Sequence, residues 1–420
     1  MYSAEFLSYY LKAIDFYETR GGEDNKQNEK KIIHIQKIIE SLRTTRFQDY
    51  VMVQCARIFY DAYPDFISLI NTKNICAFTN GVYDFDAMQF RAGRSTDYLT
   101  FTTNKEYIPY NPEDPNVQVI MNFINDILPD RDTAEYLLKI FSSCLTLDIS
   151  QQKFYVMTGI GGNGKSLLMN IFEICLGDYF GLASSALITK PRENANSANE
   201  ALASLRTKRA VVFNEVGEKE VIQADIMKML TGGDSISTRE NYGKQIKFKP
   251  FFKTITICNN IPALSENGHS EWRRIRIIHF PMKYVDHPNP NNPREKKIDY
   301  DLENKLKEAA PAMLSILIEY YKQYKENGLI EPDTVVEHTK KYQEENDRIK
   351  LFVKQFLIED PQGLVESVPL YGIFRRWFKD EYGEKEPAKK AFQEFCNNEM
   401  QSNGDDSEDG NYEETAIAFL

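Results

Sequence analysis

The spacing of apolar residues separates an N-terminal region from the rest of the chain. From residue 1 to about 70 the apolar positions recur at helical spacing, most clearly in Lys31–Arg43. Residues 74–108 then contain β-prone runs on both sides of Asn80-Gly81, a dipeptide typical of a tight hairpin turn. We therefore expect residues 1–112 to form a region of helices and a β-hairpin.

The middle of the chain alternates between two periods. Residues 117–147 have the pattern of two helices, and from about 153 to 281 apolar strands alternate with helices. This alternation predicts an α/β core with a largely parallel sheet. A later helical pattern contains Pro311, which marks either a kink or the start of a new helix. We expect the core to occupy residues 113–335 and a small separate domain to occupy residues 336–420.

The composition is that of a soluble globular protein. Hydrophobic residues make up 42% and charged residues 27% of the 420 residues. No apolar run approaches the roughly 18 residues of a transmembrane helix, and Met1–Glu18 lacks the apolar stretch of a signal peptide. We therefore expect an intracellular protein with no membrane contact. The six cysteines include no C-x-x-C pair, so neither a zinc site nor a disulfide framework is expected.

The net charge of −11 restricts how the chain could bind nucleic acid. A protein that binds DNA over its outer surface usually carries a basic face, so an acidic chain needs a local basic element. One candidate is a predicted hairpin with its tip near Tyr242-Gly243-Lys244. The basic residues around this hairpin are Arg239, Lys244, Lys247, Lys249 and Lys253.

A glycine-rich stretch near the middle of the chain has the spacing of a phosphate-binding loop. Gly159, Gly164, Lys165 and Ser166 fit the pattern G-x-x-x-x-G-K-[ST]. Glycines let backbone N–H groups surround phosphate oxygens, the lysine reaches the β- and γ-phosphates, and the serine hydroxyl holds Mg²⁺. The loop needs a strand before it and a helix after it, and the sequence from Lys153 onward predicts both. We therefore expect ATP and Mg²⁺ as ligands.

Polar residues at the ends of later segments suit the same chemistry. Arg209–Glu218 reads as a strand that ends in Asn214-Glu215, where a carboxylate would order Mg²⁺ or deprotonate the attacking water. A later strand ends at Asn259, whose amide could hold the water or sense the γ-phosphate. Arg273 and Arg274 precede another strand, and an arginine placed across a subunit interface can stabilise charge on a neighbour's phosphate. Adjacent residues of an extended segment point to opposite faces, so only one of the two is expected there.

In this order the motifs resemble those of the superfamily 3 helicases. The segments that carry the likeness are GIGGNGKS, VVFNE, LTGGDSISTREN with FKPFFKTITICNNIP, and WRRIRIIHFP. The likeness is greatest to the branch that contains the poxvirus-type primase-helicases, their relatives in other large DNA viruses, and the C-terminal helicase halves of phage and plasmid primases. It covers residues 74–400, with AFTNGVYDF upstream of the motifs and a segment similar to a winged-helix module after them.

The resemblance implies an AAA+-type ATPase that forms a homo-hexameric ring, with ATP between subunits and single-stranded DNA in the pore. Residues 1–112 would then serve as a collar or in oligomerisation. The implied function is an ATP-dependent DNA helicase of viral or mobile-element replication, or the helicase part of a primase-helicase. A primase, a polymerase and a processivity factor are the expected partners, in the host cytoplasm or a replication compartment.

The resemblance also implies a role for each site residue. Lys165 and Ser166 would be the Walker A pair, Glu215 the Walker B carboxylate, Asn259 sensor 1, and Arg274 the finger acting in trans, with Arg273 as its rival. The nucleotide contacts would be Gly159, Gly161, Gly162, Asn163, Gly164, Lys165, Ser166 and Leu167. Mg²⁺ would be held by Ser166 and Glu215. The DNA strand would be contacted by Lys244 first, then by Lys247 and Arg239.

The small C-terminal domain is expected to be a winged helix that positions DNA or a partner. Amphipathic patterns predict helices at residues 347–358, 368–382 and 387–400. Residues 412–420 could form the last wing strand, preceded by an acidic loop at Asn403–Asn411. An acidic wing tip would repel phosphate, so we do not expect the wing to enter a DNA groove.

Many Walker B strands end in two acids, whereas here the first position is Asn214, so one carboxylate would both order the metal ion and activate the water.

Other interpretations remain open. Asp84 and Asp86 have the spacing of metal ligands in a primase, although a pair flanking a turn is the favoured interpretation. The chain could also load onto DNA without unwinding it. A small-molecule phosphotransferase is the third alternative, against which the basic hairpin and the paired arginines argue.

Overall fold

The computed structural model divides the chain into two compact units, Met1–Lys73 and Asn74–Leu420. The structure describes residues 2–19, 25–63, 66–191, 199–214, 216–217, 219–239, 245–266, 268–359, 367–382, 386–387, 389–390, 392–393, 395–396 and 417–419. The three predicted domain ranges, 1–112, 113–335 and 336–420, stay predictions. The predicted hairpin region beyond residue 73 lies in the second unit together with the sheet.

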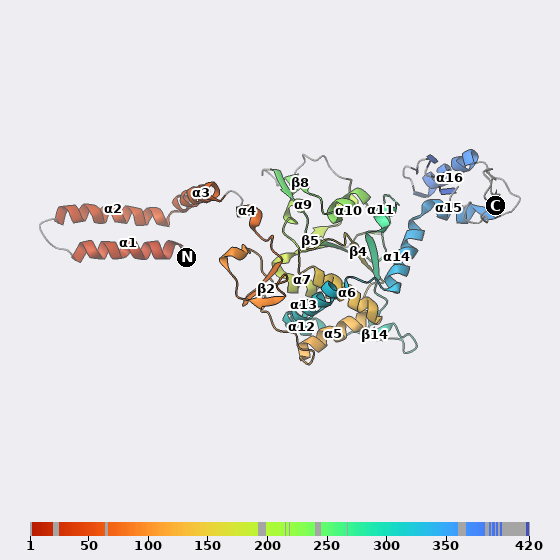
Figure 1. Cartoon of the computed structure of the whole chain (residues 1–420), viewed down its shortest axis with the longest axis horizontal. Helices are drawn as coiled ribbons and strands as arrows, with labels where there is room; N and C mark the ends of the chain where they lie inside the picture. The colour runs from red at the N-terminus through yellow and green to blue at the C-terminus, as the bar shows by residue number, and fades with distance from the viewer. Residues whose placement is uncertain are drawn as a thin grey trace. The chain divides into compact units, whose positions relative to one another are not determined.

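The first unit is helical, as the apolar spacing predicts. It contains α1 (Tyr2–Thr19), α2 (Asn25–Arg43), α3 (Thr45–Ala62) and the single turn α4 (Phe66–Leu69). Helices α1 and α2 lie side by side (Figure 1), and α2 buries Ile35 and Ile39. Helix α3 buries none of its residues.

The second unit is built around a five-stranded parallel sheet with the order β12-β4-β10-β6-β5, which confirms the predicted α/β core. The strands are β4 (Phe154–Thr158), β5 (Phe180–Ser184), β6 (Ala210–Asn214), β10 (Lys253–Ile257) and β12 (Ile275–His279). Every residue of the inner strands β4 and β10 is buried. Strands covered on both faces tend to read as continuous apolar runs, as β4 does up to Thr158, whereas β10 also buries Lys253, Thr254 and Thr256.

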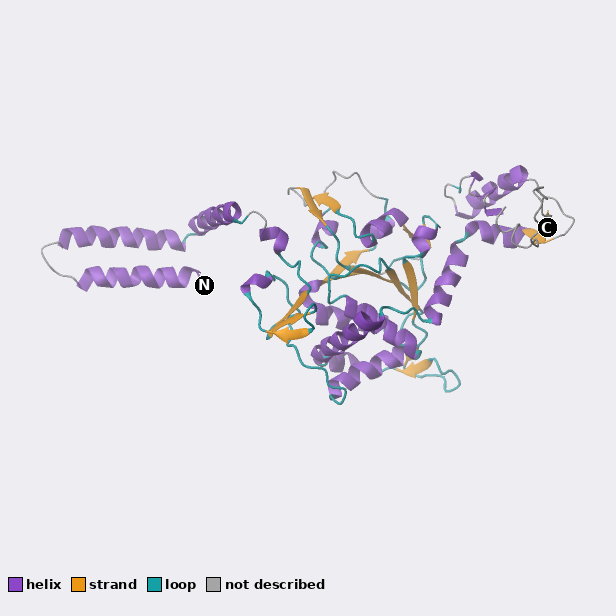
Figure 2. Ribbon diagram, viewed as in Figure 1, coloured by secondary structure: helices purple, strands orange, loops and turns teal. Residues whose placement is uncertain are grey.

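Alternate strand residues enter two separate hydrophobic cores. On one face, Tyr155 and Met157 pack with α5 (Pro115–Ile127), α6 (Arg131–Ser143), α7 (Lys165–Leu176), α12 (Leu302–Glu308) and α13 (Ala310–Asn327). On the other face, Phe154 and Val156 pack with the short helices α8 (Ala186–Thr189), α9 (Glu200–Ser204), α10 (Ala224–Thr231) and α11 (His269–Trp272). Figure 1 shows α5, α6, α7, α12 and α13 together on one side of the strands, which Figure 2 colours orange. Pro311 lies in the first turn of α13, so it starts a new helix.

Short sheets surround this core. The predicted hairpin around Asn80-Gly81 is confirmed as an antiparallel sheet of β1 (Ile75–Phe78), β2 (Gly81–Asp84) and β3 (Gln89–Arg91). The second predicted hairpin is confirmed as β8 (Ile236–Arg239) paired with β9 (Gln245–Phe248). The other pairs are β7 (Val221–Ile222) with β11 (Ala263–Leu264) and β13 (Lys283–Val285) with β14 (Glu295–Lys297). Two 3₁₀ turns, η1 (Ser95–Asp97) and η2 (Gly177–Tyr179), complete this part.

Two buried cations lie at the amino-terminal ends of the sheet strands. Lys253 donates to the carbonyls of Ser143, at 2.5 Å, and Thr146, at 3.3 Å, at the end of α6. The guanidinium of Arg209, only 1% exposed, donates to the carbonyl of Leu145 nearby. Cations suit a helix C-terminus because its last carbonyls lack partners within the helix. Lys253 is therefore a structural residue, and its inclusion in the basic hairpin was wrong.

The C-terminal segment forms a small aromatic core. This segment comprises α14 (Asp333–Asn346), α15 (Arg348–Phe356), β15 (Leu357–Glu359), α16 (Ser367–Tyr382) and β16 (Ile417–Phe419). Helix α14 packs against β12, and its buried Val335 and Tyr342 belong to the two sheet cores, whereas α15 and α16 supply residues of the aromatic core. The two helices predicted at 347–358 and 368–382 are confirmed, and β16, within the predicted last strand, pairs antiparallel with β15. The described residues of 387–400 are partly helical, and Asn403–Asn411 lies outside the described residues. The winged-helix arrangement stays a prediction.

Candidate nucleotide site

The glycine-rich loop has the strand and helix that its pattern requires. Strand β4 ends at Thr158 and helix α7 begins at Lys165. Gly164 has φ of 86°, and a Cβ there would lie 2.6 Å from Cγ2 of Ile127. Such a backbone angle and such close packing both require glycine. Helix α7 therefore starts directly after the loop, and the N–H groups in the first turn of a helix are those that a phosphate site uses.

The side chain of Lys165 is folded back over this loop. It is 3% exposed, and its Nζ donates to the carbonyl of Gly159 at 2.7 Å. Burial lowers the pKa of Lys165 to about 8, and the nearby Cys258 opposes this effect only in part. Within the described part of the chain, Lys165 forms no ion pair. A buried cation without a carboxylate partner is stabilised by an arriving anion.

A cavity of about 520 Å³ opens in front of Lys165. Its walls come from the P-loop, the start of α7, and the ends of β6 and β10, because parallel strands bring their carboxyl ends to one edge of a sheet. The lining residues are Gly161, Gly162, Asn163, Lys165, Ser166, Met169, Asn170, Asn214, Val216, Gly217, Ile257, Cys258, Asn259 and Asn260. The structure thus brings together most of the predicted nucleotide residues and Asn259.

Some predicted residues are placed differently or lie outside this description. Glu215 lies outside the described residues, although Asn214 and Val216 on either side of it line the cavity. Gly159, Gly164 and Leu167 do not line it. Gly159 instead packs where a Cβ would collide with the carbonyl oxygen of Phe280, so it fixes the loop from behind.

The lining residues that the sequence analysis did not predict are Met169, Asn170, Val216, Gly217, Ile257, Cys258 and Asn260. Asn170 follows Ser166 by one helical turn on α7, so the i, i+4 spacing could have indicated it. Cys258 and Asn260 flank Asn259 after β10. The end of β10 is tied to the end of β4, because the Thr158 hydroxyl donates to the carbonyl of Asn259 at 2.8 Å.

The two adjacent arginines have opposite environments. Arg274 is 7% exposed and donates to the Thr231 hydroxyl, at 3.2 Å, and to the carbonyl of Ser270, at 2.9 Å. The side chain of Arg273 is exposed. The two side chains differ in exposure as expected, but the expected reason was wrong: Arg273 has φ of −61° and ψ of −22° at the end of α11, so the pair is not in an extended segment.

The structure does not bring either arginine to the P-loop cavity. The carbonyl of Arg274 accepts from the N–H of Phe154, at the first residue of β4. The P-loop follows the last residue of β4, Thr158. Strand residues advance about 3.3 Å each, so the arginines and the loop are separated by roughly 13 Å along this strand.

Of the three hairpin residues predicted to contact DNA, Arg239 and Lys247 lie within the described residues. Arg239 lies opposite Gln245 and Lys247 lies opposite Ser237. Both basic side chains are exposed. Lys244 lies outside the described residues.

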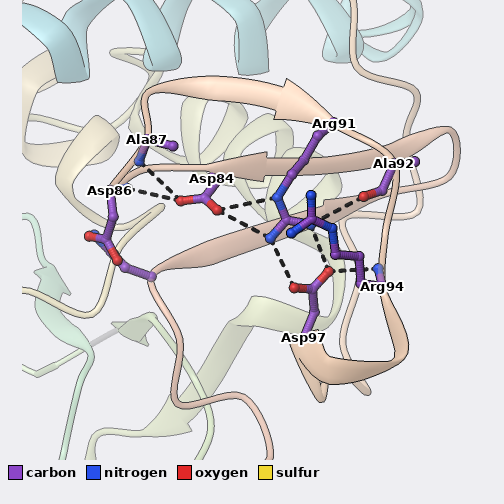
Figure 3. Close-up of polar contacts among 8 residues, drawn as sticks. Asp84, Asp86, Ala87, Arg91, Ala92, Arg94 and Asp97 are labelled. Carbon is purple, nitrogen blue, oxygen red and sulfur yellow. Dashed lines mark hydrogen bonds and ion pairs between the residues drawn. The ribbon is translucent and has the colours of Figure 1, made fainter.

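The Asp84 and Asp86 pair has a structural explanation. Asp84 and Asp97 both pair with Arg91, at 3.1 and 2.9 Å (Figure 3). Asp84 also accepts from the backbone N–H of Ala87 at 3.1 Å, and Figure 3 shows the Asp86 carboxylate directed away from Arg91. Burial alone would raise the pKa of Asp84, but these hydrogen bonds outweigh burial and lower it.

This arrangement supports the favoured interpretation of a pair that flanks a turn. In the described ranges, no three His, Cys, Asp or Glu side chains are grouped so that they could hold a metal ion. None of the helices in the described part of the chain combines the length and the hydrophobicity that crossing a membrane would require.

Two family models match the chain. Residues 6–129 match a family described as D5 N terminal like, and residues 157–274 match a family of unknown function, DUF5906. The second match begins within β4 and ends at Arg274, so it spans the P-loop, the cavity and the basic hairpin.

Proteins of large DNA viruses are similar over most of the chain. "Putative helicase L207/L206" of Acanthamoeba polyphaga mimivirus is 32% identical over 90% of this chain and 40% of its own length. "Putative helicase 121R" of Invertebrate iridescent virus 3 is 29% identical over 84% of this chain and 40% of its own length. "Putative primase C962R" of African swine fever virus (strain Badajoz 1971 Vero-adapted) is 26% identical over 61% of this chain and 27% of its own length.

A solved structure, the A form apo structure of the NrS-1 C terminal region, aligns with 78% of this chain and 81% of its own. With 14% identity and a TM-score of 0.40, this alignment carries no argument. The similar viral sequences confirm the resemblance predicted from the motifs. The chain spans about 40% of the length of the first two relatives. It is a relative of the proteins of large DNA viruses that are named as helicases and primases.

Proposed function

We propose that this chain is the ATP-hydrolysing motor of a viral replication helicase or primase-helicase. The observation that carries the proposal is the buried Lys165, unpaired within the described residues, at the wall of a cavity of about 520 Å³. A cation of this kind, beside the free N–H groups of a helix start, suits a polyphosphate. The viral relatives with helicase and primase names support the same conclusion.

The cavity residues divide the chemistry between them. Lys165 stabilises the charge that develops on the β- and γ-phosphates during transfer. Ser166 and Glu215 would hold Mg²⁺, which neutralises phosphate charge when bound. Glu215 is the base for the attacking water, and Asn259 orients that water. Because Asn214 is neutral, the proposal assigns both the metal and the base roles to the single carboxylate Glu215 that follows it in the sequence.

The charge-stabilising arginine of the site comes from a neighbouring subunit. Arg273 and Arg274 lie at the amino end of the strand pair β12 and β4, away from their own P-loop. An arginine there can reach only the nucleotide of another copy. Exposure favours Arg273 over Arg274, because Arg274 is buried with its guanidinium bonded within its own chain. A hexameric ring, with single-stranded DNA contacted by the β8–β9 hairpin, satisfies both requirements.

ATP hydrolysis by Lys165→Ala tests this proposal. Loss of the ammonium group is expected to lower ATPase activity at least about 100-fold, since it removes a cation that stabilises the transferring phosphate. The exposed Lys307, which pairs with Glu303 on α12, offers the control Lys307→Ala with unchanged activity. Activity of Lys165→Ala at the wild-type level, or a wild-type chain that does not hydrolyse ATP, would refute the proposal.

A further inference from the structure

The main chain at Arg273 is held by two cations. The carbonyl oxygen of Arg273 accepts a hydrogen bond from Nζ of Lys153 at 3.0 Å. It accepts a second from Nη1 of Arg276 at 3.4 Å. The same Nη1 donates to the carbonyl of Trp272 at 3.2 Å. Hydrogen bonds to its carbonyl groups therefore fix the turn between α11 and β12.

One carboxylate holds both of these cations. Oε1 of Glu331 lies 2.9 Å from Nζ of Lys153 and 2.6 Å from Nε of Arg276. Burial by itself would raise the pKa of Glu331, but the pairing with Arg276 and Lys153 outweighs it and lowers the pKa. The carboxylate is thus charged at neutral pH. We call Glu331, Lys153 and Arg276 the carboxylate clamp.

The clamp joins three elements that are far apart in the sequence. Lys153 directly precedes β4, Arg276 lies in β12, and Glu331 lies between α13 and α14. Its side chains are only 13%, 14% and 26% exposed for Lys153, Arg276 and Glu331, so salt screens these pairs weakly. Burying three charged groups is costly, and apolar packing would hold the same elements together at lower cost. What the charges add is the fixed direction of the Arg273 carbonyl.

Of the two adjacent arginines, Arg273 is the one whose side chain reaches outward. Arg274 is fixed by its bonds to Thr231 and Ser270. The Arg273 guanidinium makes a long contact, 3.5 Å, with Oε1 of Gln152 and is otherwise directed to the exposed surface. Charge stabilisation in phosphoryl transfer depends on placement of the donor to within about 1 Å. A fixed main chain below a free side chain provides such placement.

We propose that Glu331 is a positioning residue for Arg273, and that the carboxylate clamp presents the Arg273 guanidinium to the nucleotide of a neighbouring subunit. This inference rests on the proposed function and adds a residue outside the cavity to it. Neutralising Glu331 leaves Lys153 and Arg276 without a counter-charge, so the two repel each other and release the Arg273 carbonyl. The subunit's own P-loop stays intact.

The test is Glu331→Gln in the full chain, measured by steady-state ATPase kinetics. We expect kcat to fall about tenfold while KM for ATP changes less than about twofold, since only the arginine contributed to the neighbour is misplaced. Mixing Glu331→Gln with Lys165→Ala chains is expected to recover activity. The Lys165→Ala subunit supplies a well-placed arginine, and the Glu331→Gln subunit supplies an intact P-loop.

Controls separate this role from general stability. Glu319 pairs with Lys322 at a similar side-chain exposure, 32%, so Glu319→Gln is expected to keep wild-type kcat. Glu331→Asp retains the charge and is expected to lie between Glu331→Gln and wild type. If Glu331→Gln does not fold, Glu331→Asp is measured in its place and should show the same recovery on mixing.

The outcomes distinguish this inference from the function on which it rests. An inactive wild-type chain refutes the proposed function, and a fully active Arg273→Ala chain refutes the arginine assignment. If Arg273→Ala loses activity and recovers on mixing while Glu331→Gln keeps its kcat, the clamp does not position Arg273. Loss in Glu331→Gln without recovery on mixing refutes it equally.

Discussion

The two ends of strand β4 differ in what they offer to a nucleotide. After its carboxyl end lie the glycine-rich loop, the buried Lys165 and a cavity of about 520 Å³. Before its amino end lie the exposed Arg273 and the clamp residue Lys153. Residues that follow parallel strands meet at one edge of the sheet, and residues that precede them meet at the opposite edge. In the function proposed above, one chain therefore carries two half-sites that cannot combine with each other.

The two ends of the strand differ because they would have different tasks. A phosphate cradle needs buried N–H groups and a desolvated cation, which its own core must supply. A side chain that contacts the nucleotide of another subunit must be exposed, and its main chain must be fixed. Four measurements test this contrast, from the largest expected effect to the smallest.

Glu215→Gln is expected to lower ATP turnover about 1,000-fold while leaving ATP binding in place, because an amide cannot accept the proton of the attacking water. Single-turnover hydrolysis and equilibrium nucleotide binding measure the two separately. Glu173→Gln, on the exposed face of α7, is the control and should hydrolyse ATP normally. Normal turnover in Glu215→Gln would show that another residue is the base, and the assignment of Glu215 would be wrong.

Arg273→Ala and Arg274→Ala are expected to fail in different ways. Arg273→Ala should lower kcat about 100-fold with an unchanged Tm, since an exposed charge-stabilising donor is lost. Arg274→Ala should lower the free energy of unfolding by about 2 kcal/mol, because its hydrogen-bond partners Thr231 and Ser270 lose their donor inside the protein. ATPase assays and thermal unfolding of both variants separate these effects.

Mixing sharpens the comparison of the two arginines. The variant that lacks the trans arginine should regain ATPase activity when mixed with Lys165→Ala chains. Recovery with Arg274→Ala and not with Arg273→Ala would reverse the assignment that exposure favours.

Affinity for ATP is expected to depend on pH through Lys165. Its pKa in the nucleotide-free protein is lowered to about 8, whereas bound phosphate favours the charged ammonium group. Above pH 8 the lysine must take up a proton on binding, so affinity should fall up to about tenfold per pH unit. Below pH 8 the lysine is already charged and affinity should be flat. Calorimetric titration in buffers of different ionisation enthalpy measures the proton uptake.

The matched variant for this pH dependence is Lys165→Arg, which stays charged across the range. Its affinity, whatever its size, should not fall between pH 8 and 9.5. An equal fall in both proteins would show that another group titrates.

Lys247→Ala is expected to have the smallest effect. Loss of one exposed cation from β9 should weaken single-stranded DNA binding about threefold and make the log–log salt slope shallower by about 0.7. Lys297→Ala, an exposed lysine in β14, should leave the slope unchanged. Lys244 lies outside the described residues, and we expect Lys244→Ala to exceed Lys247→Ala. An unchanged slope in both would remove the hairpin from the DNA contact.

The sequence by itself was sufficient for features that depend on neighbouring residues. The glycine-rich loop, its strand and its helix follow from glycine positions and apolar spacing within Lys153–Gly177, and the structure confirms the strand and the helix. The hairpins at Asn80-Gly81 and between β8 and β9 follow from turn residues between β-prone runs. These features are local, since φ preferences and side-chain periodicity act over a few residues.

Tertiary structure alone decided which charged residues are buried. Lys253 and Lys247 look alike in the sequence, yet Lys253 is buried because it begins the inner strand β10, where it donates to the carbonyl of Ser143, 110 residues away. Arg273 and Arg274 were predicted to face opposite sides, and only the packing of Thr231 and Ser270 determined that Arg274 points inward. The clamp residue Glu331 has no motif and acquires its role from contacts with β4 and β12. Burial and pairing depend on which distant segments meet, and the spacing of residues along the chain contains no information about that.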